Sequence, residues 1–141
     1  MIGVVIVTHG SLADALLNTA ELIMGKQEQV KAVAFESGQA VADLQSRIMK
    51  AVTQVDSGQG TLILVDILGG SPYNASAMLM MEQVKTEVIS GVNLPMLFAV
   101  LPMRNLTLDG AAKVVLSGGR DGISQFIMNK ESAAVTEGEI S

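Results

Sequence analysis

Met1-Ile-Gly-Val-Val-Ile-Val7 opens the chain, and the short stretch Thr8-His-Gly-Ser11 separates this apolar run from a helical pattern with apolar residues at 12, 16, 20 and 23. The run lacks polar alternation, which is typical of a strand covered on both faces of a parallel sheet. A buried strand that passes through a short loop into a helix is the first part of a β-α-β unit. This junction favours an open α/β sheet, and it places a histidine, His9, at the carboxyl end of the first strand.

The rest of the chain repeats this alternation. Further strands are predicted over residues 30–35, 61–67 and 87–90, and further helices over residues 41–55, 72–84, 95–102 and 107–117. The pattern predicts a doubly wound, four-stranded, mainly parallel sheet with helices on both faces. A last strand is expected at Ile123–Met128, antiparallel at the sheet edge or paired with another subunit. We expect one domain over residues 1–130 and a flexible tail over residues 131–141.

Composition limits the classes of function. The 141 residues are 49% hydrophobic but only 3% aromatic, with no Trp and nine Met. The mean hydropathy of +0.44 is high for a small monomer, which favours a homodimer that covers part of the apolar surface. The net charge is -5 and the chain has no basic run, so we expect no nucleic-acid partner.

Cysteine and histidine counts exclude several kinds of site. The chain has no Cys, which excludes disulfides and thiolate chemistry, and its single His argues against a zinc site, so we expect no metal and no cofactor. The apolar runs are too short to span a bilayer, and no basic segment precedes the first of them as in a signal peptide. A cytoplasmic protein is the expectation.

His9 and Asp66 are the candidate catalytic pair. If the first and third strands are neighbours on either side of the reversal in strand order, the loops that carry these two residues meet at the switch point. A carboxylate that accepts Nδ1–H fixes the imidazole tautomer and leaves Nε2 as a free nucleophile. Two structural alternatives stay open: His9 as a core or capping histidine, and Asp66 as a carboxylate bonded only to backbone N–H groups.

Three loops at strand ends lead into helix N-termini, an arrangement that suits a phosphoryl group: residues 8–11, 69–72 and 91–95. Ser71 is predicted as an N-cap that can still offer its hydroxyl or N–H to an anion, with Pro72 at the first helical position. Glycines let a ligand approach the backbone. The further phosphate-binding candidates are Gly70, Gly10 and Thr8, and Thr8 is equally suited to a local cap.

Three motifs together resemble a known family: Gly3-Val-Val-Ile-Val-Thr-His-Gly10, Asp66-Ile-Leu-Gly-Gly-Ser-Pro-Tyr-Asn74 and Ser90-Gly-Val-Asn-Leu-Pro-Met96. They are similar, in order and spacing, to the enzyme IIA domain of the mannose, fructose and sorbose class of the bacterial sugar phosphotransferase system. The resemblance covers roughly residues 1 to 130.

The resemblance implies a phosphocarrier. In this family the histidine at the position of His9 takes a phosphoryl group on Nε2 from phospho-HPr and passes it to a histidine of a IIB component. Asp66 matches the aspartate that pairs with the active histidine, and Ser71 matches a residue near the phosphate. The family fold adds an antiparallel edge strand exchanged within a dimer. The membrane components IIC and IID would be indirect partners, and IIB would be a separate polypeptide, since the sequence ends at Ser141.

Three alternative functions remain at this stage. The phosphocarrier subunit of a dihydroxyacetone kinase system shares the fold and the histidine, although the motif at residues 91–96 favours sugar transport. A regulatory binding module could instead use phosphorylated His9 as a signal. A hydrolase with Ser71 as nucleophile is the third, and the absence of a G-x-S-x-G motif argues against it.

Overall fold

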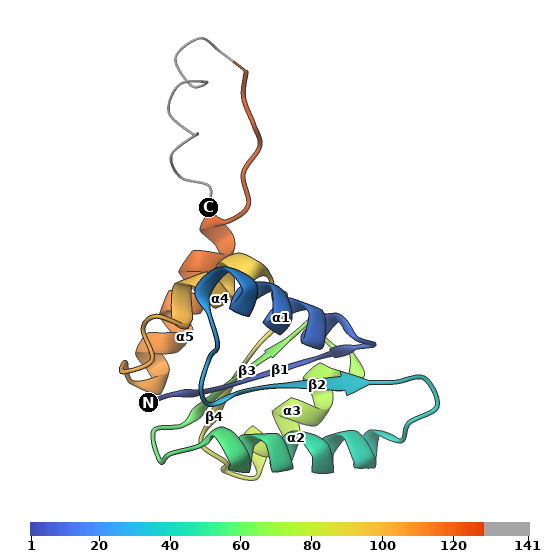
Figure 1. Ribbon diagram of the computed structural model, residues 1–141. Coiled ribbons are helices and arrows are strands. Elements are labelled where there is room, and N and C mark those ends of the chain that lie inside the picture. The colour runs from blue at the N-terminus through green and yellow to red at the C-terminus, as the bar shows by residue number, and fades with distance from the viewer. Residues whose placement is uncertain (129–141) are drawn as a thin grey trace.

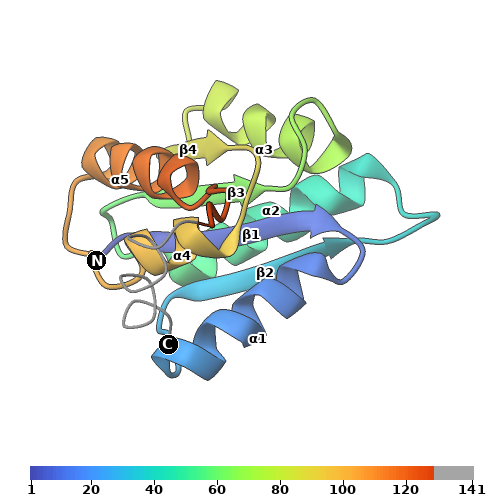
Figure 2. The same ribbon diagram turned by 90° about the horizontal axis from the view of Figure 1, so that it is seen from above.

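The computed structural model describes residues 1–128, which form a parallel sheet covered by helices on both faces. The strands are β1 (Gly3–His9), β2 (Val30–Phe35), β3 (Thr61–Val65) and β4 (Thr86–Ile89); the helices are α1 (Leu12–Met24), α2 (Val41–Val55), α3 (Ser71–Met81), α4 (Leu94–Val100) and α5 (Leu108–Asp121). The strand order is β2-β1-β3-β4, and every pairing is parallel. Helices α1, α4 and α5 cover one face, and α2 and α3 cover the other (Figures 1 and 2). The predicted four-stranded α/β fold is confirmed.

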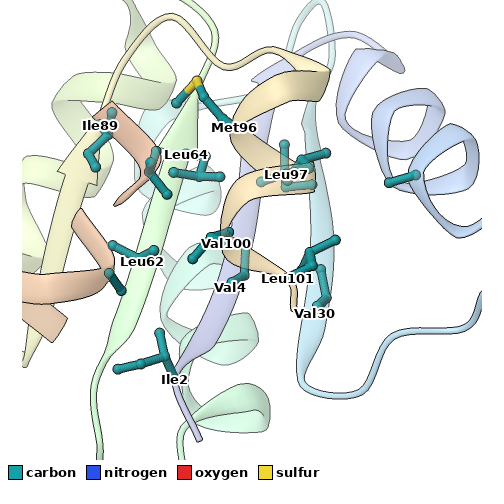
Figure 3. Close-up of a cluster of buried hydrophobic side chains, with 14 of the residues drawn as sticks. Ile2, Val4, Val30, Leu62, Leu64, Ile89, Met96, Leu97, Val100 and Leu101 are labelled. Atoms are coloured by element: carbon teal, nitrogen blue, oxygen red, sulfur yellow. The ribbon is translucent and has the colours of Figure 1, made fainter. Parts of the chain in front are cut away.

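The first strand is central, since it pairs with β2 on one side and β3 on the other, and both of its faces are covered. Val4 and Ile6 point into the core beneath α1, α4 and α5, which Figure 3 shows in close-up. Val5 and Val7 point into the second core, beneath α2 and α3. Side chains alternate between the two faces of a strand, so a strand apolar at every position has to be covered on both.

The strand order reverses between β1 and β3. From β1 the chain crosses to β2 on one side of it, and β3 lies against its other side. In sheets of this kind, ligands bind at the carboxyl ends of the strands beside the reversal. His9, the last residue of β1, and Asp66, which directly follows β3, stand at this point.

The expected fifth strand at Ile123–Met128 is not a strand of this chain's own sheet. The segment continues from the end of α5 without pairing to β4, and Figure 1 shows it leading away from the sheet. Its apolar side chains are exposed: Ile123 by 79%, Phe126 by 66%, Ile127 by 66% and Met128 by 80%. A strand needs a partner for its backbone hydrogen bonds, and this segment meets none within the described chain. The sheet of residues 1–128 therefore ends at β4, and the predicted tail at 131–141 lies outside the described residues.

No helix within residues 1–128 combines the length and the hydropathy that a membrane span requires.

At the amino-terminal edge of the sheet, the buried guanidinium of Arg104 donates to the carbonyl oxygens of Ile2 (2.7 Å) and Gln29 (3.1 Å). Arg104 thereby ties the start of β1 to the turn before β2, at the edge opposite His9.

Candidate functional site

His9 stands at the surface because β1 ends there. The six preceding residues of the strand are buried, whereas the His9 side chain is 47% exposed. Gly10 follows with φ +58°, a left-handed conformation that glycine adopts without strain, and its N–H donates to the carbonyl of Phe35 at 2.9 Å. This turn directs the chain into α1 and leaves the imidazole at the edge of the sheet.

Asp66 holds His9 through one carboxylate oxygen. Its Oδ2 lies 2.8 Å from Nδ1 of the ring and 3.0 Å from the backbone nitrogen of His9. Its Oδ1 accepts from the backbone N–H of Ile67 at 3.0 Å. The structure therefore brings together the two residues that the sequence paired, and it orients the ring by two contacts to the same oxygen.

The ionisation of Asp66 sets the tautomer of His9. Burial alone raises the pKa of this carboxyl, but the hydrogen bonds from the backbone and ring of His9, with the attraction of the ring charge, outweigh burial, and the pKa lies below its ordinary value. At neutral pH Asp66 is therefore a carboxylate that only accepts hydrogen bonds. In the neutral ring Nδ1 consequently carries the proton, and Nε2 has the lone pair and no hydrogen bond within residues 1–128.

Two further residues confine the ring, and the sequence pattern predicted neither contact. A Cβ placed on Gly70 would lie 3.0 Å from Cε1 of His9 and 3.7 Å from Nε2, so the glycine backbone packs directly against the imidazole. The Phe35 ring meets it edge to face, with centroids 6.0 Å apart. The position of Phe35 could have been predicted from the strand pairing. Phe35 is the last residue of β2, His9 is the last residue of β1, and the two residues are partners in the parallel register.

The start of α3 differs by one position from the prediction. Gly70, with extended backbone, is the N-cap, and Ser71 is the first helical residue. No side chain caps this helix, so Ser71 does not cap it, and Pro72 follows as the second helical residue. First-turn N–H groups have no partner inside a helix, and Ser71 directly follows Gly70, which packs against the His9 ring.

The structure gives Thr8 a role in the helix rather than at the surface. Its side chain is fully buried, and its Oγ1 accepts from the N–H of Ala13 at 2.7 Å, whereas Ser11 at the N-cap position of α1 makes no capping bond. A buried hydroxyl cannot touch a phosphate at Nε2, so we leave Thr8 out of the site. Asn93 caps α4 by accepting from Met96 N at 3.0 Å.

The surroundings of His9 are open and partly apolar. A hollow of about 420 Å³ adjoins the ring and is lined by Gly10, Phe35 and residues 36–38. Exposed apolar side chains stand at the first residue of α1 and on the loop between β3 and α3: Leu12 (45%), Ile67 (58%) and Leu68 (70%). Apolar side chains exposed around a reactive group are typical of a surface on which another protein docks. We call these three residues the apolar rim.

Known proteins share this sequence and fold. Residues 3–115 match the family described as PTS system fructose IIA component. The mannose-specific EIIAB component of Escherichia coli K12 is 37% identical over 124 residues, covering 86% of this chain but only 38% of that protein. The fructose-specific EIIA component of Bacillus subtilis is 38% identical over 104 residues, covering 74% of this chain and 71% of that protein.

Solved structures agree with this assignment. A phosphotransferase system component EIIA from Streptococcus agalactiae superposes with a TM-score of 0.82 at 34% identity, covering 89% of this chain and 98% of that one. A mannose/sorbose-specific IIA subunit from Enterococcus faecalis, 20% identical, has the same fold at a TM-score of 0.82, covering 92% and 97%. The chain belongs to the mannose, fructose and sorbose class of phosphotransferase-system IIA components.

Proposed function

We propose that this protein carries a phosphoryl group on Nε2 of His9, which it accepts from phospho-HPr and passes to a histidine of a IIB component. One observation carries the proposal: the 2.8 Å contact between Nδ1 and Asp66, which fixes the proton on Nδ1 and leaves Nε2 unbonded beside the N-terminus of α3. Family membership supports the same activity.

The chemistry follows from the tautomer. The Nε2 lone pair forms a new N–P bond, while the N–P bond of the donor breaks and its electron pair returns to the donor imidazole. The proton stays on Nδ1, so the His9 ring becomes positively charged as the bond forms. The carboxylate of Asp66 stabilises this charge, because an opposite charge in a partly buried site lowers the energy of the transition state.

The phosphoryl oxygens would meet donors at the two helix starts. The Ser71 N–H and hydroxyl, together with the positive end of the α3 dipole, suit an anion on Nε2. The backbone of Gly70 packs against the ring, and Gly10 follows His9 with open space where a side chain would stand, so neither residue excludes the phosphoryl group. Ser71→Ala removes only the hydroxyl, and we expect phosphorylation to slow by less than in any variant that moves the ring.

HPr and IIB would use the same surface in turn. Both have to bring a histidine to Nε2, and the exposed residues of the apolar rim follow His9 and Asp66 closely in the chain. We place this exchange in the cytoplasm, with IIC and IID as membrane components that IIB serves. The identity of the sugar belongs to those partners, and the relatives of this chain include mannose-, fructose- and sorbose-specific components.

A homodimer would cover the exposed segment Ile123–Met128. Within residues 1–128 this segment exposes four apolar side chains and pairs with no strand, and no strand pairs with the outer edge of β4. We propose that this segment of one copy pairs antiparallel with β4 of a second copy. Sedimentation of the native chain and of Phe126→Glu tests it: a dimer that Phe126→Glu dissociates is the expected result, and a native monomer would contradict it.

The function is tested by intact mass after incubation with phosphoenolpyruvate, enzyme I and HPr. We expect one acid-labile phosphate on the native chain and none on His9→Ala. Transfer from the isolated phosphoprotein to IIB completes the test, and transfer only to a dihydroxyacetone kinase would favour that system instead. No phosphate on the native chain would refute the phosphocarrier. Ester hydrolysis that Ser71→Ala abolishes would then favour the hydrolase, although no hydrogen bond joins Ser71 to His9 within residues 1–128.

A further inference from the structure

The loop that forms one wall of the His9 site has a single internal backbone hydrogen bond in the described structure, from Gly70 N to the Ile67 carbonyl at 3.3 Å. Residues 67–70 connect Asp66 to α3, and Ile67, Leu68 and Gly69 are exposed, so packing does not fix the loop. Gly69 adopts φ +82° and Gly70 follows it, and two successive glycines leave the backbone unusually free. The wall nevertheless has to stay in place, since Gly70 packs against Cε1 of His9.

Side-chain hydrogen bonds fix this loop at its two ends. At the beginning, Asp66 Oδ1 accepts from Ile67 N. At the end, the side-chain amide of Asn74 donates from Nδ2 to the carbonyl oxygen of Gly69 at 3.1 Å, while the backbone N–H of Asn74 donates to the carbonyl of Gly70 at 2.9 Å. One residue in the first turns of α3 thus binds the carbonyls of both glycines.

We propose that Asn74 is a positioning residue for phosphoryl transfer: by holding the Gly69 carbonyl it keeps Gly70 against the His9 ring, and so keeps Nε2 aimed at the incoming phosphoryl group. The proposal rests on the proposed function of His9. The Asn74 side chain is exposed and packs in neither core, so its hydrogen bond to the loop is its structural contribution. Asn74 lies five residues after Gly69 in the chain, and its side chain reaches back past the start of α3 to the Gly69 carbonyl.

The test uses Asn74→Ala and Asn74→Leu, with Asn18→Ala as the matched control. Leu has nearly the shape of Asn without the donor, and both Ala and Leu are better helix formers than Asn, so the variants should fold. Asn18 is an exposed helical Asn on α1 without a side-chain hydrogen bond in the described structure. An ordinary hydrogen bond corresponds to roughly a fivefold change in an equilibrium constant, and we expect both Asn74 variants to accept phosphoryl from phospho-HPr about fivefold more slowly.

A spectroscopic signal separates positioning from a merely structural effect. His9 is the single histidine of the chain, so its Hε1 resonance is identified without ambiguity. We expect a nuclear Overhauser contact between Hε1 and the Gly70 α-protons in the native chain and in Asn18→Ala, and its weakening in both Asn74 variants at unchanged melting temperature.

Three results would overturn the proposal. They are a native rate in folded Asn74 variants, a slow rate with the Hε1–Gly70 contact intact, and the same loss of rate in Asn18→Ala. If the native chain accepts no phosphoryl group at all, the proposed function fails instead, and the Hε1–Gly70 contact still decides whether Asn74 places the ring.

Discussion

Gly70→Ala should slow phosphorylation of His9 without unfolding the protein. The backbone of Gly70 has φ -75° and ψ 175°, which alanine adopts without strain, so the cost falls on the contact with the ring. The added Cβ would lie 3.0 Å from Cε1, whereas carbon atoms in contact prefer separations of about 3.5–4.0 Å. The imidazole therefore has to move by ~0.5–1 Å.

A displacement of this size is large on the scale of group transfer. A misplacement of about 1 Å at a reacting atom costs on the order of 100-fold in rate, so we expect the initial rate of transfer from phospho-HPr to fall by about 10- to 100-fold. Radiolabelled phosphate on His9, sampled by rapid quench, measures this rate.

Gly58→Ala is the control for the same exchange far from the ring. Gly58 has φ +96° and open space around it, so alanine strains the backbone there without touching the site. We expect Gly58→Ala to lower the free energy of unfolding by about 1 kcal/mol and to keep the native transfer rate. A native rate in folded Gly70→Ala, or an equal loss in Gly58→Ala, would refute the claim that Gly70 sets the position of the ring.

The remaining predictions concern the residues that hold the site and the sheet. Asp66→Asn removes a carboxylate whose folded pKa lies below its unfolded value, so its contribution is present above about pH 4 and is lost as the pH falls through the folded pKa. In urea unfolding, we expect the free energy of unfolding of the variant to be about 1–3 kcal/mol lower than native at pH 7 and nearly equal to native at low pH. A stability difference that becomes larger at low pH would contradict this prediction. Thr8→Val removes the acceptor for Ala13 N–H, and we expect a loss of about 1 kcal/mol in thermal unfolding with an unchanged phosphorylation rate; a large fall in rate would return Thr8 to the site. Arg104→Met leaves buried carbonyls of Ile2 and the β2 turn without donors, and calorimetry should show a loss of about 3 kcal/mol.

The sequence predicted those parts of the site that depend on the sheet. An apolar run that is buried on both faces is typical of a strand inside a parallel sheet. The first polar residues after such a run therefore lie at the carboxyl edge of the sheet. His9 and Asp66 both follow from this rule, because β1 and β3 are such strands and are neighbours. Once β1 and β3 are known to be neighbours, the proximity of His9 and Asp66 can be predicted without further long-range information.

The adjacent glycines Gly69 and Gly70 show which part of the site the sequence could not predict. A turn that needs positive φ explains Gly69, at +82°, but Gly70 has an ordinary φ and is a glycine because of the ring beside it. The contact between Gly70 and His9 joins residues 61 positions apart, so no local sequence pattern predicts it. The same limit applies to Ile123–Met128, whose composition is typical of a strand but which pairs with no strand within residues 1–128.

The contacts that make Nε2 reactive also disfavour loss of the phosphoryl group to water. A general base works best when its pKa lies near the working pH, and the pKa of Asp66 is shifted away from neutrality. Its carboxylate oxygens already accept three N–H bonds, two at Oδ2 and one at Oδ1, so it has little capacity to activate a water molecule. Phe35 and Gly70 occupy further space around the ring. A phosphoryl group on Nε2 would therefore depend on the imidazole of a docked partner for its next acceptor, which is the property a carrier needs between two encounters.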